Sequence, residues 1–271
     1  MIYCGITGHT GNLGKKFQKI ANNFKFIKFK GDIRKKKDVG KWIKNNNFDL
    51  IIHFAAIVPI SIVNKNYKLA MDINFNGTKN LIKMIKKYNS DLKWFFYSST
   101  SHVYSYSKRK IKENYKIKPI TKYGKTKLMA ENLIIKEFEN TNIRYCIGRI
   151  FSIIDNKNKD FFLKSLINKI KSKKKIVKLD NLNHYRDFIS TEQISKAIIL
   201  LWNKRYSGII NIANGRKTNL KKIAILFAKK INKKIIFSKN AETCMIANVN
   251  KLKNYGWKSK ELNFIKYFQN K

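Results

Sequence analysis

Proline, cysteine and acidic residues are all scarce in this chain of 271 residues. Its two prolines exclude a proline-rich linker or a collagen-like chain. Its three cysteines, Cys4, Cys146 and Cys244, are odd in number and widely scattered, which argues against a disulfide framework. Each stands beside apolar residues, so we expect reduced core side chains, as in a cytoplasmic protein.

The shortage of acidic residues leaves a large positive charge. Asp and Glu total 16 against 59 Lys plus Arg, which gives a formal charge of +43. Of the basic residues, 52 are Lys and 7 are Arg, whereas recognition of phosphates and bases favours the bidentate guanidinium. The chain is also rich in Asn (32) and Ile (41). A joint surplus of Lys, Asn and Ile indicates a bias in the composition of the whole chain rather than a basic patch selected for binding. We therefore interpret the charge as the solvated surface of an ordinary enzyme, with nucleic-acid or anionic-membrane binding as the alternative.

Targeting and membrane segments are also missing. The first eight residues have no basic region followed by an apolar one, which argues against a secretory signal. The longest apolar stretch, 50–63, is too short to span a bilayer. We expect a cytoplasmic protein with neither a membrane partner nor a specific nucleic-acid partner.

Apolar runs alternate with amphipathic segments over the first 150 residues. The expected strands are 2–7, 24–29, 50–55, 92–98 and 143–150, and the expected helices are 12–22, 35–46, 74–88 and 123–138. This order predicts an α/β fold with a parallel sheet covered by helices on both faces. Later expected elements are helices at 160–171, 191–204 and 218–231 and strands at 175–179 and 208–212.

A glycine-rich turn separates the first expected strand from the first expected helix. Residues 7–14 read Thr-Gly-His-Thr-Gly-Asn-Leu-Gly. The glycines permit a tight turn and close approach of a pyrophosphate, and the helix N-terminus adds N–H donors and a favourable dipole. A turn without a ligand is the alternative, but the whole chain has only 12 glycines. We therefore expect dinucleotide binding at Gly8, Thr10, Gly11, Asn12, Leu13 and Gly14.

The segment after the second expected strand bears on the choice of cofactor. An acidic side chain there would bind the adenosine ribose, whereas a basic one would attract a 2′-phosphate. Lys30 and Arg34 flank Asp32, and no acid precedes Asp32 in this segment. We expect NADP or NAD, with a slight preference for NADP, and we place Lys30 in the cofactor site.

Tyr123 and Lys127 are four residues apart and share one face of an expected helix. The spacing alone is uninformative, because three further pairs have it: Tyr104 with Lys108, Tyr106 with Lys110, and Tyr267 with Lys271. Only Tyr123 opens a long helix downstream of a Ser/Thr-rich strand end, 98–101. That context favours the Tyr123 and Lys127 pair.

Thr100, Tyr123 and Lys127 together suit hydride transfer at an alcohol carbon. A phenol with an ordinary pKa of about 10 must be shifted toward neutrality to act as an acid or base, and a nearby ammonium favours its anion. Lys127 would do this while holding the nicotinamide ribose, and Thr100 would orient the substrate oxygen toward Tyr123. We predict these three as catalytic residues.

In this order the motifs resemble the extended short-chain dehydrogenase/reductases that modify nucleotide sugars, namely epimerases, 4,6-dehydratases and 4-keto-sugar reductases. The resemblance covers nearly the whole chain. Its segments are 8–14, 31–33, 53–56, 74–78, 98–104, 123–127, 149–151, 186–189 with 193–194, and 211–215.

The resemblance implies a Rossmann-like doubly wound parallel sheet with a smaller C-terminal substrate-binding lobe. The dinucleotide-binding domain would comprise 1–150, with 185–204 returning to it, and the lobe would comprise 151–184 and 205–271. Many members of the family dimerise through two helices, here 77–88 and 122–139, so a homodimer is expected.

The resemblance also implies site residues. The cofactor-binding residues it adds are Asp32, Ile33, Phe54, Ala55, Ala56, Asn74, Ser98, Tyr123, Lys127, Arg149 and Phe151. The substrate-binding residues are Thr100, His102, His184 and Arg186. No cluster of His, Cys and Asp has the spacing of metal ligands, so no metal is expected.

Two departures from the family pattern reduce the number of reactions to be expected of this chain. In the 4,6-dehydratases an Asp-Glu or Ser-Glu pair follows the catalytic threonine, whereas the two residues after Thr100 here are Ser101 and His102. The carboxylate that abstracts the C5 proton is therefore missing, although His102 could itself be a base. The chain also ends soon after Trp257, as in the compact keto-sugar reductases rather than most 4-epimerases.

We therefore expect an NAD(P)-dependent 4-keto-sugar reductase that acts on a nucleotide-linked sugar. An epimerase acting at C4 of such a sugar is the near alternative. A noncatalytic NADP-sensing or nucleic-acid-binding protein is the alternative from another class, because fold does not determine function.

Overall fold

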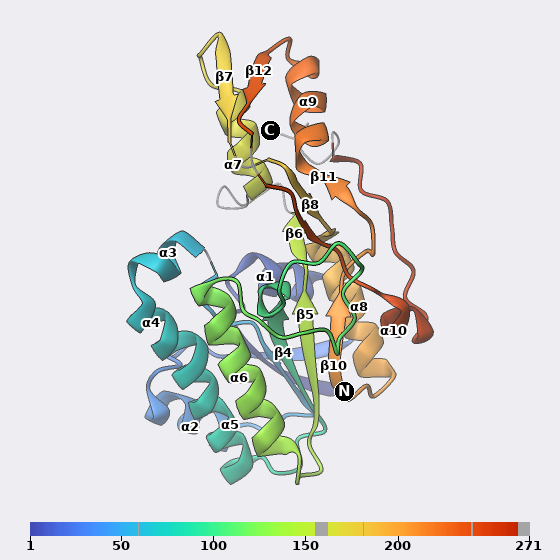
Figure 1. Ribbon diagram of the computed structural model, residues 1–271. Coiled ribbons are helices and arrows are strands. Elements are labelled where there is room, and N and C mark those ends of the chain that lie inside the picture. Colours follow the sequence, from blue (N-terminus) through green and yellow to red (C-terminus); the bar gives the residue numbers. More distant parts are fainter. Residues whose placement is uncertain (59, 155–161, 181, 240, 265–271) are drawn as a thin grey trace.

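The computed structural model describes residues 1–58, 60–154, 162–180, 182–239 and 241–264. Its centre is a parallel sheet of six strands in the order β10-β5-β4-β3-β1-β2 (Figure 1). These strands are β1 (Ile2–Thr7), β2 (Phe24–Lys28), β3 (Leu50–His53), β4 (Trp94–Thr100), β5 (Arg144–Ile150) and β10 (Gly208–Ile212).

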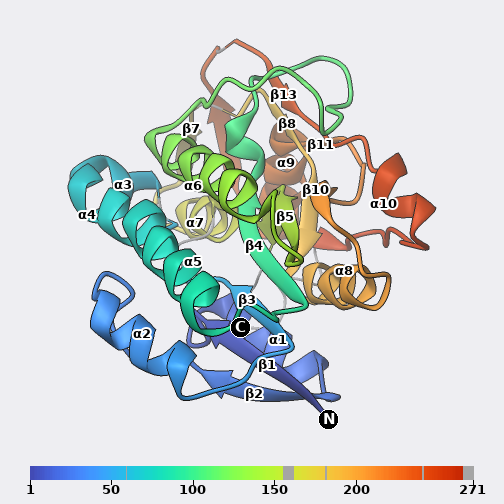
Figure 2. The same cartoon turned by 90° about the horizontal axis from the view of Figure 1, so that it is seen from below.

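Helices cover both faces of this sheet (Figure 2). One face carries α2 (Lys36–Lys44), α5 (Gly77–Tyr88) and α6 (Lys122–Phe138), and the other carries α1 (Asn12–Ile20) and α8 (Thr191–Asn203). β3 is buried along its whole length, as its continuous apolar sequence requires of a strand covered on both sides. The predicted Rossmann-like fold is confirmed.

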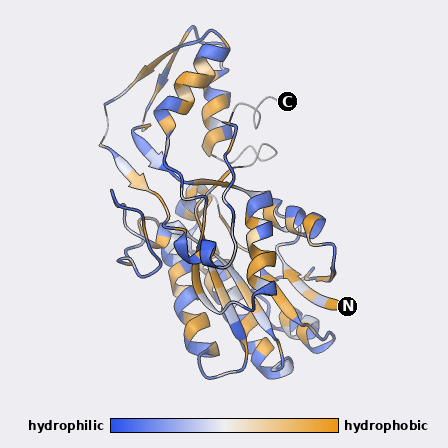
Figure 3. Ribbon diagram, turned by 90° about the vertical axis from the view of Figure 1, so that its right-hand side faces the viewer, coloured by the Kyte–Doolittle hydropathy of each residue, from blue (hydrophilic) through white to orange (hydrophobic). Residues whose placement is uncertain are grey.

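A smaller lobe stands beyond the carboxyl ends of the strands (Figure 1). Its helices α7 (Phe162–Ile170) and α9 (Leu220–Lys230) contribute to an apolar core of their own. Figure 3 shows hydrophobic residues in orange in this lobe as well as in the larger domain. Its strands are β7 (Ile176–Leu179) paired with β12 (Lys234–Phe237), and β8 (His184–Arg186) between β11 (Thr218–Asn219) and β13 (Thr243–Met245).

Shorter elements complete the description. They are α3 (Ile60–Lys65), α4 (Tyr67–Met71), the π-turn η1 (Asp72–Asn76), the 3₁₀ turn η2 (Ser101–Val103), α10 (Asn250–Asn254) and the strand pair β6 (Ser152–Ile154) and β9 (Phe188–Ser190).

The sequence-based division into domains needs one correction. The strand at 208–212, assigned to the C-terminal lobe, is β10 at the edge of the main sheet, parallel to β5. Its side chains Ile210 and Ile212 are fully buried, and a Cβ on Gly148 of β5 would lie 2.7 Å from Ile212 Cδ1. The side chain of Ile212 thus occupies the space that Gly148 leaves open.

Some expectations fall partly outside the described residues. The helix expected at 160–171 is α7, described from Phe162, and the Tyr267 and Lys271 pair is not described. The three cysteines are buried and unpaired. Among the described helices, none combines the length and apolarity needed to cross a bilayer.

Candidate active site

The glycine-rich turn packs without spare room between β1 and α1. Gly8 has a φ of +66°, and a Cβ there would lie 2.6 Å from the backbone nitrogen of Ala55. A Cβ on Gly14 would overlap the carbonyl oxygen of Gly8. Gly11 is the N-cap of α1 and provides no side chain to its first turn. The first N–H groups of α1 therefore remain available to an anion.

Two substitutions separate the structural role of these glycines from ligand binding. Gly14→Ala should destabilise the protein by about 1–3 kcal/mol, because backbone atoms rather than a flexible side chain obstruct the new methyl group. Gly11→Ala should fold normally, since its φ is −69° and its nearest contact would be 3.3 Å, yet it should weaken dinucleotide binding. Thermal melts and cofactor titrations of both variants measure these effects, and unchanged dinucleotide affinity of Gly11→Ala would contradict this role for the turn.

A pocket of about 550 Å³ opens beside the turn. Six residues predicted to bind cofactor line it: Gly8, Thr10, Lys30, Asp32, Ile33 and Ala55. Five lining residues were not predicted: His9, Phe29, Gly31, Arg34 and Ile73. The first four are next to predicted cofactor-binding residues in the sequence, and that position was a signal that could have identified them. Ile73 comes from η1 and also adjoins a predicted residue, Asn74.

The charges at this pocket are partly paired. The guanidinium of Arg34 donates to the carboxylate of Asp32, with Nη2 and Oδ2 2.6 Å apart. This pairing lowers the pKa of Asp32 to about 2. Lys30 is exposed and has no ion pair among the described residues. The pocket thus offers one carboxylate held in place and one ammonium available for a ligand.

The predicted catalytic residues meet at the carboxyl end of β4. Thr100 is the last residue of β4, Tyr123 lies in the first turn of α6, and Lys127 lies one turn later. Thr100 lies close enough to the Tyr123 hydroxyl to favour its anion, which opposes the effect of burial on the pKa of Tyr123. Thr121 caps α6 by accepting from Gly124 N at 2.9 Å, which fixes the start of the helix and hence Tyr123.

Burial determines the proton affinities of Tyr123 and Lys127. It raises the pKa of Tyr123 and lowers the pKa of Lys127 to about 7, with Glu131 opposing the latter shift. The Lys127 ammonium lies 4.1 Å from the centre of the Tyr97 ring. Because burial disfavours both charged forms, positive charge or hydrogen bonding brought by a ligand would be needed to lower the pKa of Tyr123.

A buried ion pair that the sequence did not reveal supports this site. Glu131 and Arg149 are 0% and 2% exposed, and Arg149 Nη2 lies 2.7 Å from Glu131 Oε2. Ser99 also donates to Glu131. Arg149 further donates to the hydroxyl of Tyr104 at 2.9 Å and to the carbonyl of Glu113 at 3.0 Å.

The side chain of Arg149, which is expected among the cofactor-binding residues, is used within the protein. Its guanidinium is directed into the protein, where these acceptors satisfy its charge and hydrogen bonds. Glu131, the partner of Arg149, has one sequence signal: it lies four residues after Lys127 and therefore on the same face of the helix.

Three other expected cofactor residues also use their side chains within the protein. The Asn74 amide pairs with the backbone of Ile57 and donates to Thr126 Oγ1 at 3.0 Å. Phe151 packs against Tyr104, and Phe54 packs against neighbouring aromatic rings. These residues shape the site rather than offering polar groups to it. Ala56 and Ser98 remain partly exposed at this edge of the sheet.

On the expected substrate side, the structure brings His102 and Arg186 close enough to interact. Burial and the charge of Arg186 lower the pKa of His102 to about 4, so its imidazole is neutral near pH 7. Arg186 on β8 donates to Thr243 Oγ1 at 3.1 Å. His184, two residues earlier, lies 2.7 Å from the same oxygen through its Nδ1. Both side chains thus contact Thr243 of β13, and the Arg186 guanidinium also lies over the ring of Tyr106, 5.3 Å from its centre.

A family model covers most of the chain. Residues 5–261 match the model described as GDP-mannose 4,6 dehydratase.

Curated relatives differ in how much of the chain they match. A candidate UDP-glucose 4-epimerase of Methanocaldococcus jannaschii is 26% identical over 262 residues, 93% of this chain and 82% of that protein. A GDP-6-deoxy-D-talose 4-dehydrogenase of Aggregatibacter actinomycetemcomitans is 25% identical over 220 residues, 78% and 74% of the two chains. The UDP-glucose 4-epimerase of Pisum sativum is 33% identical over 104 residues, 38% of this chain and 29% of that protein.

The fold also recurs in solved structures. RMD from Pseudomonas aeruginosa complexed with NADPH superposes with a TM-score of 0.87 at 19% identity, over 98% of this chain and 96% of that chain. At this identity, the similarity establishes the arrangement of the fold.

Proposed function

The chain belongs to the GDP-mannose 4,6-dehydratase family of NAD(P)-dependent nucleotide-sugar epimerases and dehydratases, and we propose that it is a 4-keto-sugar reductase acting on a nucleotide-linked sugar. The observation that carries the proposal is the meeting of Thr100, Tyr123 and Lys127 at the carboxyl end of β4, on the same edge of the sheet as the glycine-rich turn that follows β1. Ser101 and His102 follow Thr100 in η2, where the dehydratases that the motifs resemble have a carboxylate. Reduction needs the trio but not that carboxylate.

The residues present fit a dinucleotide. The turn at Gly8 to Gly14 and the uncapped α1 suit a pyrophosphate, and the pocket at Asp32 and Ile33 has room for the adenosine. When bound, NAD(P)H supplies the hydride. Lys127 would hold ribose hydroxyls, and hydrogen bonds from the bound ligands would favour its charged form, which would then stabilise the Tyr123 phenolate.

The protein's own part in the reaction is to orient the keto sugar and to supply a proton. Thr100 would donate a hydrogen bond to the C4 oxygen and hold it toward Tyr123. As hydride reaches C4, the carbonyl oxygen gains charge and takes the proton from the Tyr123 hydroxyl, which gives the alcohol. Arg186, on the lobe side, would attract the diphosphate of the substrate.

The relatives support two versions of this chemistry. The name of the dehydrogenase from Aggregatibacter actinomycetemcomitans describes net redox chemistry at position 4, which favours a reductase. The relative from Methanocaldococcus jannaschii favours a 4-epimerase as the second candidate. An epimerase would use the same trio, but with no net change in the cofactor.

The experiment that separates the candidates is a panel of UDP-, GDP- and dTDP-linked sugars and their 4-keto forms. The 4-keto sugars are incubated with NADPH or NADH, and the sugars with NADP⁺ or NAD⁺, because an epimerase must first transfer a hydride from C4 to the oxidised cofactor. A reductase oxidises one cofactor molecule for each keto sugar reduced. Interconversion of sugars at C4 without net cofactor oxidation would instead establish the epimerase, and no turnover of any compound would contradict the enzymatic proposal.

We also propose that NADP is the preferred cofactor, with Lys30 contacting the 2′-phosphate. Arg34 is less available to bind this phosphate, because its guanidinium forms an ion pair with Asp32. Lys30→Ala should weaken NADPH binding about tenfold and leave NADH binding unchanged, which corresponds to about 1.4 kcal/mol. Lys28→Ala is the matched control, because Lys28 is exposed at the end of the same strand but does not line the pocket. Equal losses for both cofactors would contradict the assignment.

A further inference from the structure

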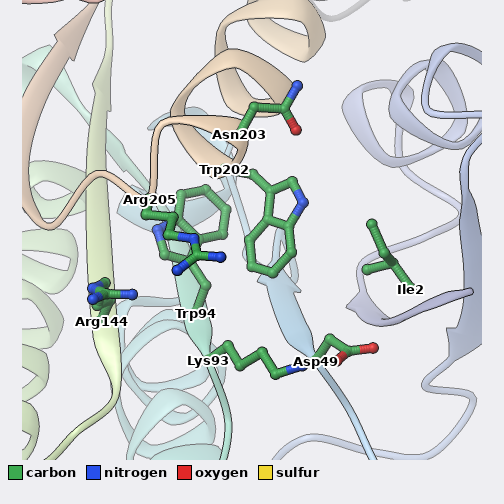
Figure 4. Close-up of a pocket in the computed structure, with 8 residues that line it drawn as sticks. All are labelled: Ile2, Asp49, Lys93, Trp94, Arg144, Trp202, Asn203 and Arg205. Carbon is green, nitrogen blue, oxygen red and sulfur yellow. Dashed lines mark hydrogen bonds and ion pairs between the residues drawn. The ribbon is translucent and has the colours of Figure 1, made fainter.

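A second pocket lies at the opposite edge of the sheet, where the strands begin. Its volume is about 450 Å³, and Figure 4 shows the side chains that line it. Ile2, Trp94 and Arg144 are the first residues of β1, β4 and β5. The remaining lining residues are Asp49, Lys93, Trp202, Asn203 and Arg205. The residues proposed for catalysis lie at the other end of the strands, so this pocket is separate from that site.

The pocket carries positive charge that the protein does not neutralise. Asp49 accepts from Lys93 Nζ at 2.7 Å and from the backbone of Tyr3 at 2.8 Å, so its charge is used by Lys93. Arg144 and Arg205 are exposed, and neither has an ion pair within the described part of the chain. Two guanidinium groups therefore remain available for an anion.

The use of arginine here is unusual for this chain. Only 7 of its 59 basic residues are arginine. Four of the seven have specific acceptors in the structure: Arg34, Arg149, Arg186 and Arg216. Because lysine is the usual cation of this chain, two arginines in one pocket indicate a requirement for the planar, forked guanidinium. That group binds carboxylates and phosphates in a bidentate manner.

The backbone of Arg205 provides an independent observation. Its φ is +49°, and the one other described non-glycine residue with positive φ is an asparagine, Asn232. Arg205 follows the end of α8, where Tyr206 N donates to Leu201 O at 3.0 Å. Glycine or asparagine normally occupies such a left-handed position after a helix. A long basic side chain held in a disfavoured conformation points to a function for that side chain.

An aromatic wall adjoins the arginines. Trp94 is anchored, since its indole N–H donates to Tyr206 O at 2.7 Å. Trp202 is partly exposed and packs against Trp94 at 5.8 Å between ring centres. In Figure 4 the guanidinium of Arg205 extends from the end of α8 toward the two indoles. Aromatic faces of this kind bind flat rings, including nucleobases.

We propose that this pocket binds a nucleoside monophosphate, with its phosphate on Arg144 and Arg205 and its base against Trp202. The pocket volume lies in the usual range for small-molecule sites, about 300–1,000 Å³. The proposal does not depend on the reaction proposed above, because none of the catalytic residues takes part in it.

The test uses the protein labelled with 5-fluorotryptophan and followed by ¹⁹F NMR during titration with AMP. The chain has four tryptophans, and single Trp→Phe variants assign their signals. AMP should shift the Trp202 signal in a saturable manner. Arg205→Gly should weaken this binding at least tenfold while melting at the same or a higher temperature, because glycine suits the backbone there. Lys204→Gln, which removes a neighbouring exposed charge that does not line the pocket, should bind like the parent protein.

The dinucleotide pocket provides an internal reference. Trp42 packs against Phe29 of that pocket, with 5.2 Å between ring centres, so AMP bound there would shift the Trp42 signal. Arg205→Gly should leave that shift unchanged. A titration that moves only Trp42, equal affinity of parent and Arg205→Gly for the Trp202 response, or binding of inorganic phosphate as tight as that of AMP would each overturn the proposal.

Discussion

Replacing Tyr123 with phenylalanine should lower turnover by about 10²–10⁴-fold, the usual contribution of a general acid or base, and leave cofactor binding nearly unchanged. The variant removes one hydroxyl and keeps a ring of the same shape in a position that is 8% exposed. The lost group is the hydroxyl that neighbours Thr100 and is proposed to protonate the C4 oxygen. The measurement is kcat on the substrate found in the panel, together with NAD(P)H titration by fluorescence.

Tyr88→Phe is a suitable control for this experiment. Tyr88 is the last residue of α5 and is 38% exposed, so removing its hydroxyl should change neither turnover nor cofactor binding. Near-normal turnover by Tyr123→Phe would remove this residue from the mechanism. A parallel loss of turnover and cofactor binding would indicate that the variant disturbs the whole site.

Removing one partner of the buried Glu131 and Arg149 pair should destabilise the protein by about 3–5 kcal/mol, because the other charge is left without compensation. This is a large part of a typical folding free energy of about 5–15 kcal/mol. Glu131→Gln keeps the shape of the side chain and is the first variant to test, followed by Arg149→Met. Urea unfolding measures the free energy of each.

Combining the two substitutions distinguishes an ion-pair effect from a packing effect. The double variant should be less destabilised than the sum of the single variants, because neither charge is then left alone in the core. Glu137→Gln is the control on the same helix. Glu137 pairs with Lys86 at 2.7 Å with 26% side-chain exposure, and an exposed pair contributes about 0–1 kcal/mol. Equal losses for Glu131→Gln and Glu137→Gln would contradict the account of the buried pair.

The elements closest to the proposed chemistry were the most predictable from sequence. The first strand, Ile2–Thr7, has the predicted bounds, because a short apolar run ends at a glycine that must take a positive φ. The Tyr123 and Lys127 pair was separated from three similar pairs by its position at a helix start. Each of these signals is local in the chain.

Features that depend on distant segments were not predictable in the same way. Glu131 was overlooked because a carboxylate on a helix usually faces solvent, and only the fold brings it to Arg149, eighteen residues later. The edge strand β10 was assigned to the wrong part of the molecule because its apolar run fits either lobe. The pocket at the amino ends of the strands draws residues from five separate parts of the chain, and no motif joins them.

The most direct test of the proposed reaction is to follow the hydride itself. The 4-keto nucleotide sugar that the enzyme accepts would be incubated with NAD(P)H carrying deuterium at the transferable position, and the product analysed by NMR and mass spectrometry. The proposed reaction predicts one deuterium at C4 of the sugar for each cofactor oxidised, and about 10²–10⁴-fold less labelled product with Tyr123→Phe over the same time. Product without deuterium at C4, or deuterium at another carbon, would contradict hydride transfer between the nicotinamide and C4.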